Sequence, residues 1–192
     1  GGGRCNVTNA EFDTRVMLKN YGKAEQFLYS LFAQYNVADT FQFFESYGLP
    51  LVVEARKRAF PQTHDANDVV RVLETYIQQG HVDVVHGSAV KQVIYTDNTI
   101  VSVQSGTNTY HAKNYILATG SISHPETGST GDGLNWLKEA GHTVVDPTPD
   151  IVPLASRAAW VKSISGTTLH DVKATFSCEG VKSFVLQGDI LC

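Results

Sequence analysis

Several features that would assign this protein to a specialised class are scarce or absent. Its 192 residues include 15 Lys and Arg against 19 Asp and Glu, so the formal charge is −4 and no basic excess exists. Nucleic-acid-binding domains usually carry such an excess. No apolar run approaches the ~20 residues that a membrane-spanning helix needs. We therefore expect neither a nucleic acid nor a membrane as a partner.

Cysteine is also scarce. Cys5, Cys178 and Cys192 are odd in number and far apart. They form neither the paired framework of a small secreted domain nor the C-x-x-C spacing of a zinc site. The histidines show no ligand spacing such as H-x-x-x-H, so the sequence predicts no metal centre. A reducing compartment fits this cysteine usage best, and we expect a cytoplasmic protein.

The two ends of the sequence suggest an internal piece of a longer protein. The chain opens on three glycines, its only methionine is Met17, and residues 188–192 have the composition of an unfinished strand. Apolar residues make up 42% and charged residues 18%, which predicts a packed core rather than disorder. The sequence leaves the oligomeric state open.

Hydrophobic periodicity predicts a mixed α/β chain. Helices are expected at residues 22–34, 38–47 and 67–79. The third helix has Asp65, Asn67 or Asp68 as its N-cap and Gly80 as its stop. Extended structure is expected at 51–54, and period-two strands, including an antiparallel meander, at 82–85, 90–95, 100–104 and 109–111.

The meander leads into an apolar run at 115–120, which we expect to be a buried strand. A stretch rich in glycine and serine follows, and a helix is expected to begin at Asp132 or Gly133. In a strand, glycine-rich loop and helix that follow one another in this order, backbone N–H groups of the loop and helix N-terminus can donate to phosphate or carbonyl oxygens of a ligand. A second glycine-rich stretch occupies residues 1–9. Both stretches have the alternative interpretation of ordinary turns, and neither is a G-x-G-x-x-G.

Three prolines, Pro147, Pro149 and Pro153, predict a domain boundary. We assign residues 1–150 to a first domain. Residues 151–192 have a strand-like pattern and are assigned to the beginning of a second domain.

Six short motifs occur in a fixed order along nearly the whole chain. They are GGGRCNVTN at 1–9, AFPQ at 59–62, ILATG at 116–120, TGSTGDG at 127–133, GHTV at 141–144 and IVPL at 151–154. Together they resemble the bacterial FAD-dependent oxidoreductase family that includes 3-dehydro-bile-acid Δ4,6-reductases and aminoacetone oxidase-like flavoproteins. The resemblance implies a partial FAD/NAD(P)-binding, Rossmann-like domain with a β-meander, without its first strand and G-x-G-x-x-G loop. The start of an inserted, mainly-β domain would follow.

The same resemblance implies the residues that contact the cofactor. The opening segment would run along the flavin, and the backbone at Val90 would meet the adenine. A turn at 119–120 would lie beside the cofactor, and a loop at 131–133 would close on it. The implied contacts are Gly2, Gly3, Arg4, Cys5, Asn6, Thr8, Val90, Thr119, Gly120, Gly131, Asp132 and Gly133. No catalytic residue is assigned.

The implied activity is hydride transfer between NAD(P)H, the flavin of FAD and a small organic acceptor. The alternative is a cofactor-free binding scaffold of the same fold. Because the resemblance puts the phosphate loop before residue 1, this chain alone is expected to bind FAD weakly and to be inactive. Four features also have an interpretation that involves no cofactor. Cys5 could be an inert thiol, Arg4 part of a surface ion pair and Asp132 a helix N-cap. The basic residues 56–58 could be a solvated stretch rather than a contact with the phosphate of a pyridine nucleotide.

Overall fold

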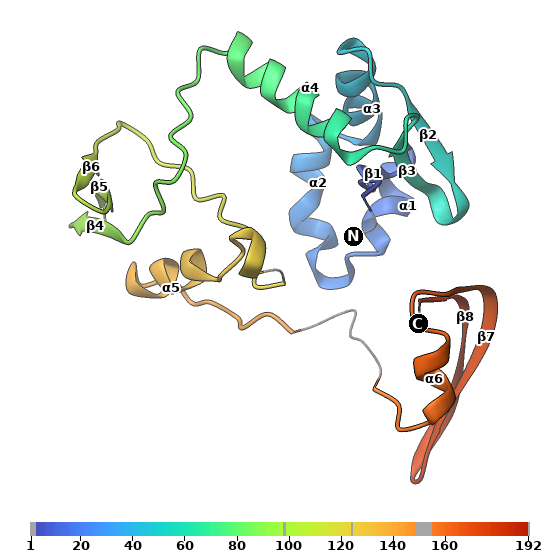
Figure 1. The fold of residues 1–192 in the computed structure, drawn as a ribbon. Helices are drawn as coiled ribbons and strands as arrows, with labels where there is room; N and C mark the ends of the chain where they lie inside the picture. The colour runs from blue at the N-terminus through green and yellow to red at the C-terminus, as the bar shows by residue number, and fades with distance from the viewer. Residues whose placement is uncertain (1–2, 98, 124, 149–154, 192) are drawn as a thin grey trace. The chain divides into compact units, whose positions relative to one another are not determined.

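The chain contains both helices and strands in the computed structural model (Figure 1), which fits the predicted α/β class. The structure describes residues 3–97, 99–123, 125–148 and 155–191. The chain divides into two compact units, Gly1–Gly87 and Ser88–Cys192.

A three-stranded antiparallel sheet organises the first unit. Its strands are β1 (Thr8–Asn9), β2 (Leu51–Glu54) and β3 (Arg58–Pro61), in the order β1-β3-β2. Thr8 lies opposite Ala59, and Leu51 lies opposite Pro61. The start of the chain is therefore hydrogen-bonded to a strand that lies about fifty residues further along. The extended structure expected at 51–54 is confirmed as β2.

Helices make up the rest of this unit. They are α1 (Thr14–Lys19), the 3₁₀ turn η1 (Gly22–Ala24), α2 (Glu25–Gln34), α3 (Val37–Ser46) and α4 (Ala66–Gln79). All three predicted helices are confirmed within a few residues. The Asp65 side chain caps α4 by accepting a hydrogen bond from the backbone N–H of Asn67, and Gly80 follows its last turn, as predicted.

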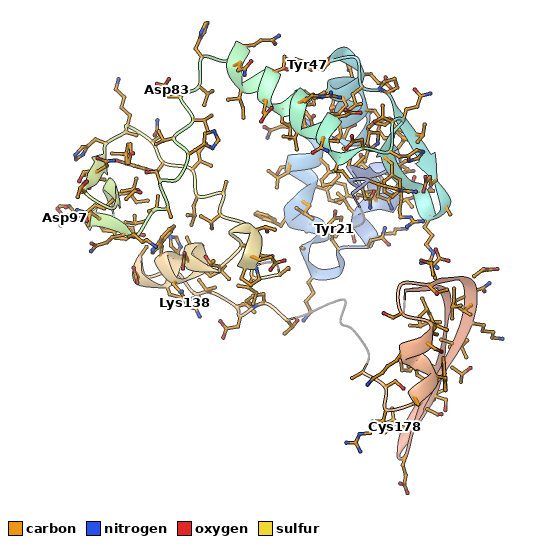
Figure 2. All side chains as sticks on the ribbon, viewed as in Figure 1. Tyr21, Tyr47, Asp83, Asp97, Lys138 and Cys178 are labelled. Atoms are coloured by element: carbon orange, nitrogen blue, oxygen red, sulfur yellow. The ribbon has the colours of Figure 1, made fainter. Side chains whose placement is uncertain are left out.

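The core of the first unit lies between the sheet, α3 and α4. Phe44, Leu49, Leu51, Val69 and Val72 are its buried members. Each fully buried side chain of this size contributes about 1.5–3 kcal/mol relative to an exposed one. Tyr47, at the end of α3, extends this packing toward α4 (Figure 2), where its ring lies 6.2 Å from that of Tyr76.

The second unit contains the predicted meander. Its strands are β4 (Gln92–Thr96), β5 (Thr99–Ser105) and β6 (Asn108–Tyr110), paired in that order and antiparallel. Gly106 adopts a φ of 58° in the two-residue turn between β5 and β6, a conformation that favours glycine. The helix α5 (Asp132–Glu139) follows the glycine-rich loop, which also holds the 3₁₀ turn η3 (Pro125–Thr127).

The last described segment is a short helix, α6 (Ala159–Ser163), followed by a long hairpin of β7 (Thr168–Cys178) and β8 (Val181–Leu191). Phe176 pairs with Phe184, and their rings stack with centroids 4.9 Å apart. Ala174 and Leu186 are the next pair on the same face. This hairpin therefore has one apolar face.

Three expectations about local structure are wrong. Residues 82–85 are not a strand. Residues 115–120 are not a strand either, and the Ile116 side chain is 93% exposed. A strand requires a hydrogen-bonded neighbour, and among the described residues none pairs with either segment. Residues 159–163 form a helix in a region expected to be strand-like.

The predicted boundary between residues 150 and 151 stays a prediction, because residues 149–154 lie outside the described part of the chain.

Candidate functional site

The opening segment is fixed to the first unit by backbone hydrogen bonds. The carbonyl of Gly3 accepts a hydrogen bond of 2.8 Å from the backbone N–H of Ala66, at the start of α4. The N–H of Val7 donates to the carbonyl of Ala59, also at 2.8 Å. Gly3 has a φ of 72° and open space where a Cβ would lie. Gly2, also predicted to contact the cofactor, lies outside the described residues.

Arg4 lies between an acidic and an aromatic side chain. Its Nη2 atom is 2.6 Å from Oε2 of Glu54, and its guanidinium carbon lies 4.1 Å from the centre of the Phe60 ring. Oε1 of Glu54 is also 3.7 Å from Nδ1 of His64. The Arg4 side chain is 42% exposed, so it keeps donors available on the surface. The ion-pair interpretation of Arg4 is confirmed as one of its contacts.

The opening segment also contains Cys5, Asn6 and Thr8, which were predicted to contact the cofactor. Cys5 is partly buried against the core cluster and has a φ of 56°, which is unusual for a residue other than glycine. With its amide nitrogen turned toward the backbone, Asn6 donates to the carbonyls of Thr8 and Ala59 at 3.1 and 3.2 Å. Thr8 belongs to β1. Asn6 and Thr8 therefore hold the segment against the strand β3, and Cys5 packs on the core cluster.

The glycines of the second unit permit close contact between two loops. A Cβ on Gly131 would lie 2.6 Å from Cγ2 of Ile122, and a Cβ on Gly133 would collide with Oγ1 of Thr119. A Cβ on Gly120 would lie 3.2 Å from Oγ of Ser129. Residues 119–122 and 129–133 therefore interlock, and the predicted residues Thr119, Gly120, Gly131 and Gly133 meet at this contact.

Asp132 begins α5, which confirms the predicted helix start, but it is not the N-cap of that helix. Gly131 is the N-cap of α5, with a φ of 85°, and Asp132 is the first residue of the helix. The N-cap position requires a non-helical backbone, and glycine adopts this one without a Cβ penalty. The Asp132 carboxylate accepts a 2.8 Å hydrogen bond from Oγ1 of Thr130 and adds negative charge to the first turn, where the helix dipole favours it.

A largely apolar cavity of about 580 Å³ adjoins the interlocked loops. Val90 and Thr119, both predicted to contact the cofactor, lie on its wall. The strands β4 and β5, residues 115–119, the second half of α5 and residues 140–142 after it supply the remainder of the lining. Its size is typical of a site for a small molecule or a cofactor fragment.

Tyr95 connects the meander to α5 at this cavity. Its hydroxyl donates a 3.1 Å hydrogen bond to the backbone carbonyl of Trp136. Burial, and then the negative charge of Glu139, raises the pKa of Tyr95 above its usual value. The phenol is therefore neutral, which suits its role as a donor.

The structure brings the predicted residues together in two groups, one in each unit. Gly3, Arg4, Cys5, Asn6 and Thr8 form the first group. Val90, Thr119, Gly120, Gly131, Asp132 and Gly133 belong to the second. That the two groups meet at one cofactor stays a prediction.

Sequence reasoning missed several residues beside these groups. Glu54 and Phe60 surround Arg4, and Tyr95 and Trp136 border the cavity. Phe60 lies within the AFPQ motif, which was a usable signal. Glu54 offered none, because the register that places it near Arg4 depends on the pairing of β2 with β3.

Two kinds of feature are absent from the residues that the structure describes. No three His, Cys, Asp or Glu side chains in this part of the chain could hold a metal ion together. No helix in the same residues has the length and apolar character needed to cross a membrane.

Comparison of the sequence with protein-family models shows the family to which the chain belongs. The model of the HI0933-like protein Rossmann domain matches residues 1–191. The chain belongs to the HI0933-like family. This membership confirms the resemblance found in the sequence and the Rossmann-type class of the fold.

Curated relatives of this HI0933-like chain include two bacterial proteins. One is the 3-dehydro-bile acid delta(4,6)-reductase of Clostridium scindens, 27% identical over 154 residues, which are 80% of this chain and 36% of the relative. The other is the ribosomal RNA dihydrouridine synthase of Haemophilus influenzae, 27% identical over 174 residues, which are 88% of this chain and 42% of the relative. The chain spans less than half of either relative.

Proposed function

We propose that this chain is part of an FAD-dependent oxidoreductase that passes hydride from NAD(P)H through the flavin to a small organic acceptor. The observation that carries this proposal is the interlocked pair of loops in the second unit. Thr119 and Gly133 meet there at the edge of a cavity that Val90 also lines. These are three of the positions that the family resemblance assigns to cofactor contacts.

The residues fit a dinucleotide cofactor in their chemistry. The cavity is lined mainly by aliphatic and aromatic side chains, which suits a flat ring such as adenine. In the first unit, the open space at Gly3 and the exposed part of Arg4 suit close approach to a polar, anionic group. In the proposed enzyme, Val90 and Thr119 would hold the nucleotide end and the segment from Gly3 to Thr8 the flavin end.

FAD, when bound, supplies the hydride chemistry. The protein's contribution is binding and orientation. The bonds from Ala66 to Gly3 and from Val7 to Ala59 keep the opening segment rigid, and Arg4 supplies positive charge that would stabilise an anionic ring. The apolar lining of the cavity would exclude water from the part of the cofactor that it covers.

The names of the relatives narrow the proposed chemistry. One is a reductase, and the other forms a dihydro product. Both names describe the addition of hydrogen to an unsaturated organic molecule. We therefore take an unsaturated acceptor as the proposed substrate class.

An absorbance spectrum tests the proposal. The purified protein, as its gene encodes it, is incubated with FAD and freed of excess cofactor. Its absorbance is then recorded between about 300 and 550 nm, where oxidised flavins absorb. We expect flavin bands that bleach when NADH or NADPH is added without oxygen. A spectrum with no flavin bands after reconstitution would favour the cofactor-free scaffold instead.

A further inference from the structure

Three hydroxyl groups meet where the second unit begins. Oγ of Ser88 donates a 2.8 Å hydrogen bond to Oγ of Ser105 and lies 3.2 Å from the hydroxyl oxygen of Tyr110, within hydrogen-bond distance. Ser105 is the last residue of β5 and is buried, and Tyr110 is the last residue of β6. This hydroxyl cluster, Ser88, Ser105 and Tyr110, therefore joins the start of the unit to the ends of two strands.

The hydroxyl cluster fixes a segment that lies outside the meander. Residues 88–91 form neither a helix nor a strand. At the far end of this segment, the backbone N–H of Lys91 donates a 2.7 Å hydrogen bond to the carbonyl of Gln104 in β5. Val90 lies between the two attachments, so its backbone is held from both sides.

Val90 has backbone groups that a ligand can use. It lines the apolar cavity of about 580 Å³. Among the residues that the structure describes, no backbone hydrogen bond uses the N–H or the carbonyl of Val90. A donor and an acceptor on one residue match adenine, in which a ring nitrogen that accepts lies beside an amino group that donates. Hypoxanthine has a carbonyl in place of that amino group and matches the pair less well.

Burial alone does not require the bonds of Ser88. This residue is only partly buried, so water could satisfy its hydroxyl equally well. Hydrogen bonds weaken steeply when their angles change, and two of them on one hydroxyl hold it in a single position. Because Ser88 is two residues from Val90, this position also restricts the Val90 backbone at the cavity wall.

We propose that Ser88, held by Ser105 and Tyr110, is a positioning residue that sets the backbone of Val90 to select adenine among purine bases. The hydroxyl cluster acts through Val90 and needs no contact of its own with the nucleotide. The assignment of the base to the adenine end of FAD rests on the proposed function, which gives this cavity to the nucleotide end of the cofactor.

Isothermal titration of the purified protein, as its gene encodes it, with ADP and with IDP tests the positioning role without requiring a flavin. The two nucleotides share their ribose and diphosphate, so the ratio of their dissociation constants reports recognition of the base. The variants are Ser88→Ala, which removes the hydroxyl, Ser88→Thr, which keeps one, and Tyr110→Phe. Ser183→Ala, at an exposed serine of β8 in the same unit, is the control.

We expect the unsubstituted protein to bind ADP at least about tenfold more tightly than IDP, because IDP leaves a backbone group unpaired. Ser88→Ala should lower this ratio to about two by weakening the binding of ADP alone. Ser88→Thr should keep most of the preference, Tyr110→Phe should lose part of it, and Ser183→Ala should match the unsubstituted protein.

Several results would overturn the positioning role. They are a ratio near one in the unsubstituted protein, no measurable binding of ADP, and a ratio that Ser88→Ala leaves unchanged. A merely structural role of Ser88 would weaken the binding of both nucleotides equally and keep their ratio. If urea unfolding shows that Ser88→Ala does not fold, the ratio in Tyr110→Phe decides, and an unchanged value there refutes the proposal.

Flavin content, measured in parallel from the absorbance spectrum, separates this role from the proposed function. A protein whose preference for ADP depends on Ser88 but that shows no flavin bands would retain the positioning role and refute the flavoenzyme. A protein with normal flavin bands and the same ratio in Ser88→Ala would do the reverse.

Discussion

The two glycine-rich segments are held in place by different interactions, although both are rich in glycine. In the opening segment the backbone is hydrogen-bonded to β3 and to the start of α4. In the second unit, residues 119–122 make no strand and are held against 129–133 by packing of side chains on bare glycine backbone. At Gly3, glycine permits a positive φ. At Gly133, the lack of a Cβ leaves the space that the Thr119 side chain occupies.

This difference has consequences for mutational sensitivity. A segment fixed by backbone hydrogen bonds tolerates a changed side chain, because the bonds do not involve it. A contact that depends on the absence of a Cβ fails when one methyl group is added. The second unit should therefore be the more sensitive of the two to substitutions of glycine by alanine.

The largest effect is expected for Gly131→Ala. The added Cβ would meet Ile122, and the φ of 85° is unfavourable for alanine, so we expect a loss of about 3 kcal/mol in the free energy of unfolding. Gly180→Ala is the matched control, because its φ is 76° but its Cβ would meet open space. Urea unfolding measures both. Equal losses in the two variants would show that Ile122 does not press on Gly131.

Gly133→Ala gives a test of sign. Gly133 lies inside α5, where alanine normally stabilises a helix by about 0.5–1 kcal/mol over glycine. Because the new Cβ would collide with Thr119, we expect a destabilisation of about 1–2 kcal/mol instead. The double variant with Thr119→Ala should recover much of this loss. A stabilised single variant would contradict the described packing.

Tyr95→Phe removes the hydrogen bond to the carbonyl of Trp136 and should cost about 1 kcal/mol. The raised pKa of Tyr95 adds a dependence on pH: its contribution is present below the usual value of 10.0 and is lost as the pH rises through the higher folded value. Ultraviolet titration of the phenols should lose its latest component in the variant. A titration curve that keeps this component would assign it to another tyrosine.

The smallest effect concerns Lys57→Gln in the first unit. The hydrogen bond from Lys57, and then the backbone N–H of Asp13, hold the pKa of Glu11 below its usual value of 4.5. This pairing favours the fold above that value and is lost as the pH falls through the lowered one. We expect the pKa of Glu11 to rise in the variant, as followed by carboxyl NMR. An unchanged pKa would show that Lys57 does not reach Glu11 in solution.

The sequence predicted those elements whose signals are local. The helix α4 followed from its cap at Asp65 and its stop at Gly80, and the meander followed from alternation and turn residues. The prediction of a strand at 115–120 was wrong. Apolar character indicates a tendency toward burial, whereas a strand also needs a hydrogen-bonded neighbouring strand. The helix begins at Asp132 as predicted, but the N-cap interpretation of Asp132 was wrong because Gly131 adopts the capping conformation itself.

The candidate site was less predictable than the fold. The motifs identified which segments matter, and the structure brought Thr119 and Gly133 into contact as neighbours. Glu54 and Tyr95 were missed because their roles arise from pairing between strands and from contact with α5, which neither periodicity nor motif spacing encodes.

Hydrogen–deuterium exchange with and without FAD tests the central claim most directly. In the purified protein as its gene encodes it, the amides of residues 3–9 and of residues 119–133 should both exchange more slowly when FAD is added, while those of α2 should not change. Protection of only one segment, or of neither, would contradict the claim that both contact one cofactor.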